Sequence, residues 1–190
     1  KFLKKLYGIK ESLKELMINY VQDFVRDCWN TELKGSSTME NYKHNAISLI
    51  AKTFSEKKIS YNFMSVGDME EIVIRYPVPY GPQIDLEFIS LDDNSNAVFL
   101  IAEGLLNGVP KDKRIDMLET LNAINYCTSY IRLSLTEKGQ ICMLCDVPES
   151  CSDECLGQVC FEILKDAEKT LDDEYCDLMT ILYGEEKDSG

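Results

Sequence analysis

Several stretches of this sequence alternate apolar and charged residues with a period of two, which is typical of strands that bury one face. Between residues 70 and 76, Ile72 and Ile74 alternate with Glu71 and Arg75. The strands predicted in this region cover residues 59–66, 70–76, 84–90 and 97–103. One face of such an antiparallel sheet packs on the core. We expect the opposite face, which carries Glu, Asp, Arg, Ser and Thr, to be exposed or to serve as a docking surface.

Segments with helical periodicity surround these strands. The spacing of apolar residues predicts helices over 39–57, 110–126 and 152–184, with a further strand pair at 130–136 and 140–147. Ser37 or Thr38 is placed to cap the first helix, Pro110 to open the second, and Ser152 to cap the third. Gly184 ends the third helix. The order predicts an α+β fold, α-β(3–4)-α-β(2)-α, with helices packed on one face of an antiparallel sheet.

The N-terminal segment is predicted to be a separate amphipathic helix over residues 1–33. Apolar residues recur there in steps of three and four, and the candidate interaction residues among them are Leu6, Leu13, Tyr20 and Phe24. This stripe must pack on the rest of the chain, on a second copy or on a partner, and the sequence leaves the three options open. Residues 34–37 form a linker. The α+β domain then spans 38–184, followed by a frayed acidic tail over 185–190.

Charge excludes some classes of partner. The chain of 190 residues has a formal net charge of −13. Residues 1–60 have a net charge of +4, so residues 61–190 have a net charge of −17. Such an acidic protein repels nucleic acid phosphates and anionic lipid heads. No apolar run reaches the roughly 20 residues of a membrane span, and no signal peptide pattern is present. Because the sequence begins with Lys1 rather than Met, we expect that the natural chain extends upstream.

Cysteine use is typical of the reducing cytoplasm, where the protein is predicted to reside. The cysteines predicted to act as small buried hydrophobes are Cys127, Cys142, Cys160 and Cys176. An alternative reading is a zinc or thiol-redox site, since four thiols are closely spaced at Cys142, Cys145, Cys151 and Cys155. On a strand, however, Cys142 and Cys145 point to opposite faces because their separation is odd.

The sequence offers no catalytic constellation. His44 is the single histidine, and we expect it at the surface near a helix start. No glycine-rich phosphate loop of either common type occurs. We therefore predict no catalytic residue and no cofactor. We also prefer the hypothesis without a bound metal to the zinc alternative.

Residues 41–184 resemble the YbjN-like family, whose fold is similar to that of type III secretion chaperones. The resemblance is carried by the strand-rich region 63–103 and by the motifs RIDMLETLNAINY, YIRLSLTEKGQICMLCDVP and DDEYCDLMTILYG. At Cys176, before Asp177, the family pattern has Pro instead. The resemblance implies a cytoplasmic, non-enzymatic protein with protein-binding roles by analogy with those chaperones.

From the residues and the resemblance together we expect a non-enzymatic protein-binding module, chaperone-like or regulatory. Its partner is an unknown protein or peptide, with a homodimer as an alternative. A third reading, an interaction arm of a larger assembly, rests on the missing initiator Met and the charge asymmetry.

Overall fold

A computed structural model describes residues 42–91, 96–147 and 150–184. The predicted helix over 1–33, with Leu6, Leu13, Tyr20 and Phe24, and the predicted tail over 185–190 lie outside the described residues. All described residues belong to one compact unit, Met39–Gly190.

Six strands form a single antiparallel sheet in the order β1-β2-β3-β4-β6-β5. The first four follow one another as a meander, after which the chain crosses to the sheet edge and returns to insert β6 beside β4. The strands are β1 Asn62–Val66, β2 Met69–Pro77, β3 Gln83–Ser90, β4 Val98–Leu106, β5 Arg132–Leu135 and β6 Ile141–Val147. Every predicted strand is present, although β1 begins three residues later than predicted.

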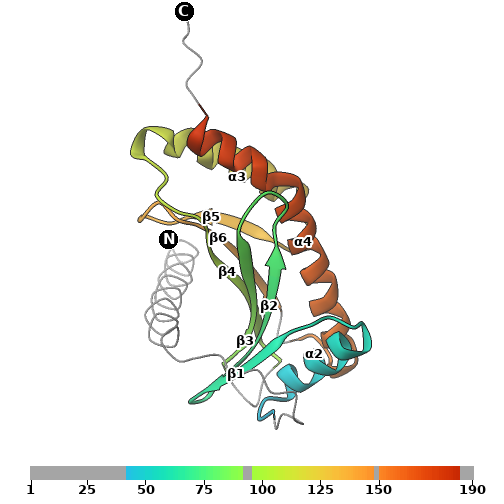
Figure 1. Ribbon diagram of the computed structural model, residues 1–190. Helices are drawn as coiled ribbons and strands as arrows, with labels where there is room; N and C mark the ends of the chain where they lie inside the picture. Colours follow the sequence, from blue (N-terminus) through green and yellow to red (C-terminus); the bar gives the residue numbers. More distant parts are fainter. Residues whose placement is uncertain (1–41, 92–95, 148–149, 185–190) are drawn as a thin grey trace, which may run out of the picture. The chain divides into compact units, whose positions relative to one another are not determined.

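The helices α2, α3 and α4 pack on one face of this sheet, which confirms the predicted α+β class (Figure 1). Their bounds are α2 Asn45–Glu56, α3 Arg114–Cys127 and α4 Asp153–Tyr183. A short 3-10 turn, η1 Lys111–Lys113, precedes α3, so the α-helix starts four residues after Pro110. The long helix α4 contacts both α2 and α3. Along its whole length, from Leu156 to Leu182, it contributes buried side chains to the core.

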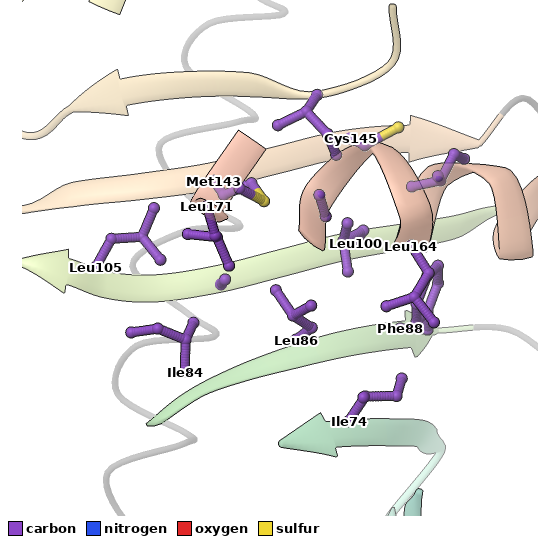
Figure 2. Packing of buried hydrophobic residues seen from close by; sticks show 14 of the residues in the cluster. Ile74, Ile84, Leu86, Phe88, Leu100, Leu105, Met143, Cys145, Leu164 and Leu171 are labelled. Atoms are coloured by element: carbon purple, nitrogen blue, oxygen red, sulfur yellow. The ribbon is translucent and has the colours of Figure 1, made fainter. Parts of the chain in front are cut away.

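The core lies between these helices and the facing side of the sheet. Ile72 and Ile74 of β2 point into it, as the alternation predicts. Figure 2 shows side chains from four strands gathering with Leu164 and Leu171 of α4. The strand residues labelled there are Ile74, Ile84, Leu86, Phe88, Leu100, Leu105, Met143 and Cys145. Burial of these side chains supplies the main driving force for the fold.

The first described helix begins later than the sequence predicts. Residues 42–44 are not helical, and the N-cap of α2 is His44. The reason is a carboxylate from the sheet, since Glu70 accepts hydrogen bonds from the backbone N–H groups of Lys43 (2.7 Å) and His44 (2.9 Å). The helix therefore starts where Glu70 satisfies donors that a helix N-terminus leaves free.

Helix α4 starts and ends where predicted, but not by the predicted contacts. Ser152 occupies the N-cap position and makes no side-chain capping bond. The neighbouring Asp153 instead accepts hydrogen bonds from the side chains of Asn45 (3.0 Å) and Asn96 (2.6 Å). Gly184 follows the last helical residue with an ordinary negative φ of −61°. These bonds tie the start of α4 to α2 and to the segment before β4.

Candidate functional site

Helix α3 is apolar on two opposite faces. Its buried face consists of Met117, Leu121 and Ile124, each at most 4% exposed. On the other side, Ile115 is 69% exposed, Leu118 45% and Tyr126 91%. At 3.6 residues per turn, these three side chains fall within roughly a quarter of the helix circumference. We call Ile115, Leu118 and Tyr126 the α3 stripe.

The start of α3 is held by two basic side chains that donate hydrogen bonds to backbone carbonyl oxygens of the same chain. Lys113 Nζ donates to the carbonyl oxygens of Leu182 and Gly184, both at 3.2 Å. Arg114 donates to the carbonyl oxygen of Glu137 at 2.7 Å. The Lys113 bonds hold the end of α4, with Tyr183 at 69% exposure, against the start of α3, and the Arg114 bond ties that start to the β5–β6 turn. The stripe thus lies on an anchored helix.

The apolar spacing that predicts this helix includes Ile115, Leu118 and Cys127. All three are exposed. A signal was available in the sequence, because apolar residues occur around most of the circumference of this helix instead of in one stripe. Periodicity alone does not say which of two apolar faces meets the core.

The sheet face turned away from the three helices, which we call the second face, mixes acidic and apolar side chains. On β2 it presents Glu71, Val73 and Arg75, and on β3 it presents Asp85, Glu87 and Ile89. Phe99, Ile101 and Glu103 continue it on β4. The expectation of an exposed face is wrong at Glu71, Val73, Ile89 and Ile101, which are buried. Strands such as 98–102 (VFLIA) and 141–145 (ICMLC) are apolar on both faces, a pattern typical of sheets covered on both sides.

Electrostatics on this face is dominated by carboxyl groups. Burial raises the pKa of Glu71 from 4.5 to about 7. Burial, assisted by repulsion from Glu71, Glu103 and Asp85, raises the pKa of Glu87 from 4.5 to about 8. The pKa of Glu103 is also raised, mainly by burial, and Lys138 opposes that shift.

His44 is not at the surface, contrary to the sequence expectation. Its side chain is 3% exposed, and Nδ1 lies 3.0 Å from the hydroxyl of Ser90. Ser90 is fully buried at the end of β3. His44 is the N-cap residue of α2 and lies against the end of β3, an interior strand of the sheet. This geometry gives His44 a structural role that joins α2 to β3.

The cysteines divide into buried and exposed thiols. Cys142 and Cys145 are both buried, and Cys145 belongs to the helix-facing core while Cys142 lies on the second face, as the odd spacing predicts. Cys151 is half-buried and Cys155 is exposed. Cys160 is buried as predicted, whereas Cys127 and Cys176 are exposed, which corrects the prediction for these two.

This arrangement bears on the zinc and redox alternatives. Within the described ranges, no three His, Cys, Asp or Glu side chains are grouped so that they hold a metal ion. Burial raises the pKa of Cys142, and raises that of Cys145 to about 11. The pKa of the half-buried Cys151 is raised as well. Thiols with raised pKa values are mostly protonated near neutral pH and are weak nucleophiles and metal ligands.

No family model, curated protein or solved structure matches this chain. Among the helices that the structure describes, none is long and apolar enough to cross a membrane.

Proposed function

We propose that this protein is a non-enzymatic, cytoplasmic protein-binding module, chaperone-like or regulatory, that docks an amphipathic segment of a partner protein on the α3 stripe. One observation carries the proposal: an anchored helix exposes Ile115, Leu118 and Tyr126 together on one side. Exposed apolar side chains that cluster on one helix face are a common feature of protein interaction sites. The chaperone-like part of this proposal rests on the resemblance of residues 41–184 to the YbjN-like family.

Charge indicates the chemistry of the partner. The chain has a net charge of −13, and Asp116 and Glu119 are exposed beside the stripe. Lys113 and Arg114 are engaged with carbonyl oxygens of the chain itself. A partner segment with an apolar face and flanking Lys or Arg complements this surface, and the attraction speeds its association. A second copy of the chain has the same excess of negative charge, so we favour a separate partner.

The test uses the full chain and two synthetic amphipathic helices with the same leucine face, one carrying lysine and the other glutamate on its polar face. We expect the lysine peptide to bind and the glutamate peptide to bind at least tenfold more weakly. Replacing Ile115, Leu118 and Tyr126 together by Ala leaves the net charge unchanged. This triple variant is expected to lose at least tenfold in affinity for the lysine peptide, because buried apolar anchors contribute most of the energy of such contacts.

Tyr80→Ala is the matched control, since Tyr80 is fully exposed in the β2–β3 loop and lies outside the stripe. Its affinity for the lysine peptide should equal that of the wild type. Equal affinities of the wild type and the triple variant would refute the docking site. A wild-type dimer that the triple variant converts to monomer in sedimentation velocity would assign the stripe to a second copy and overturn the proposed partner.

A further inference from the structure

Three glutamates lie on the second face of the sheet, on three neighbouring strands. Glu71 of β2 pairs with Ile89 of β3, and the next position on this face pairs Val73 with Glu87. Glu87 in turn pairs with Ile101 of β4, and Glu103 lies two residues along that strand. The register therefore places Glu71 and Glu103 diagonally on either side of Glu87.

The surroundings of these carboxyl groups are apolar. Glu87 has Val73 and Ile101 as cross-strand neighbours, and Glu71 has Ile89. Glu71 is 4% exposed, and its Oε2 atom is buried without a hydrogen-bond partner. An ionised carboxylate in such a place loses its hydration without compensation, whereas a protonated one carries no charge to solvate. Neutral carboxyl groups therefore suit this face better than ionised ones.

Among the residues that the structure describes, no cation is placed to compensate the charges of Glu71 and Glu87. Arg75 bonds Asp85 at 2.9 Å, and Arg132 donates to the backbone oxygen of Ile131 at 2.6 Å. The charge of Lys138 lowers the pKa of Glu103 and so partly opposes the effect of burial on that residue. The charged and titratable groups that share the second face with the pair are Arg75, Asp85, Glu103, Arg132, Cys142 and Asp146. Asp85 and Glu103 disfavour the ionised form of Glu87 further.

We propose that the second face is a proton-dependent switch, in which neutral Glu71 and Glu87 stabilise the paired strands β2, β3 and β4 and their joint ionisation loosens this pairing. The two carboxyls act as a coupled pair, because ionising one makes ionising the other harder. Loosening exposes the apolar side chains that lie between them, Val73, Ile89 and Ile101. The switch is separate from the α3 stripe, which lies on a helix packed against the other face.

The sign of the pH dependence follows from the raised pKa values of Glu71, about 7, and Glu87, about 8. Below about pH 4.5 both carboxyls are protonated in the folded and unfolded states alike. As the pH rises from about 4.5 towards 8, the unfolded chain releases these two protons at a lower pH than the folded protein does. Stability from this pair is thus present at low pH and is lost as pH rises to about 8.

The test measures urea unfolding and the binding of an apolar fluorescent dye between pH 5 and pH 9. One raised pKa unit corresponds to a tenfold change in an equilibrium constant, so we expect the unfolding constant of the wild type to rise by at least roughly a hundredfold over this range. Dye fluorescence should rise with it. The double variant Glu71→Gln with Glu87→Gln should show a much flatter profile in both measurements.

Glu56→Gln is the matched control, because Glu56 is exposed at the end of α2. It removes one carboxyl group and should keep the wild-type profile. If the double variant fails to fold, the single variants Glu71→Gln and Glu87→Gln supply the same comparison. A wild-type unfolding constant that does not change with pH, or a double variant with the wild-type profile, would overturn the switch. Neither result affects peptide binding at the α3 stripe.

Discussion

Glu70 Oε2 accepts the backbone N–H of His44 at 2.9 Å, so a strand residue caps a helix whose N-cap residue lies 26 positions before it. The other oxygen of the same carboxylate accepts the N–H of Lys43 at 2.7 Å. Glu70 is 1% exposed, and both its oxygens are used. One buried side chain thus fixes where α2 starts and holds that helix to β2.

Replacing Glu70 by Ala should destabilise the protein by about 1.5–3 kcal/mol, the usual contribution of hydrogen bonds to a charged group. Two backbone donors lose their acceptor inside the protein, and the start of α2 is released from the sheet. Urea unfolding at neutral pH measures the loss. Glu56→Ala, on the exposed end of the same helix, should change stability by no more than about 0.5 kcal/mol. Equal losses in the two variants would contradict the capping role.

Replacing Gly157 by Ala should destabilise the protein, although Gly→Ala substitutions inside helices usually stabilise. Exchanging Gly for Ala inside a helix normally stabilises it by about 1 kcal/mol. At Gly157 of α4, however, an added Cβ would lie 2.8 Å from the carbonyl oxygen of Leu49 and even closer to the hydroxyl of Thr53. Because α2 packs so closely here, Gly157→Ala is expected to destabilise by about 1–3 kcal/mol.

A second variant checks the cause of that loss. Thr53→Ala removes the hydroxyl nearest to the new methyl group and leaves the contacts with Thr53 Cβ at 2.9 Å and with the carbonyl oxygen of Leu49. Combined with Gly157→Ala, it should recover part of the stability, giving a coupling energy above about 0.5 kcal/mol in a double-mutant cycle. Strict additivity, or a stabilising Gly157→Ala, would show that the two helices separate without cost.

Local patterns predicted most of the fold. The predicted strands β2 and β3 and the helical spacing in α4 each depend on residues close in sequence, and each is confirmed. The start of α2 was wrong because it depends on Glu70, which is 26 residues away from His44. A contact of this kind leaves no periodic signal in the sequence.

Surfaces were harder to predict than elements. Ile115 and Leu118 contribute to the apolar spacing that predicts α3, as the buried Leu121 and Ile124 do, and the spacing does not show which of these residues meet the core. On the sheet, Glu71 and Glu87 were interpreted as the wet side of an alternating pattern. The alternation places both on the polar side of their strands, but it does not show that Glu71 is buried and Glu87 half-buried beside Ile89 and Ile101, which strand pairing brings next to them.

Thiol labelling should follow burial in the folded protein. Cys127, Cys155 and Cys176 are exposed, so a brief treatment with iodoacetamide at neutral pH should modify them first. Cys142, Cys145 and Cys160 are buried and should react only after local opening or in urea. Peptide mapping by mass spectrometry measures the order. Simultaneous protection of Cys142, Cys145, Cys151 and Cys155 that a chelator removes would instead support a zinc site.

Truncation to Ala should reduce the stability of the protein at one of two neighbouring residues of α3 and leave it nearly unchanged at the other. Met117 is fully buried, so Met117→Ala is expected to cost about 2–5 kcal/mol through lost apolar burial and the cavity left behind. Leu118 is 45% exposed, so Leu118→Ala should change stability by no more than about 0.5 kcal/mol. The difference separates the two apolar faces of the helix, and thermal unfolding of both variants measures it. If Leu118→Ala cost as much as Met117→Ala, the exposed face would already be packed in the isolated protein, and the α3 stripe would not be free to bind a partner.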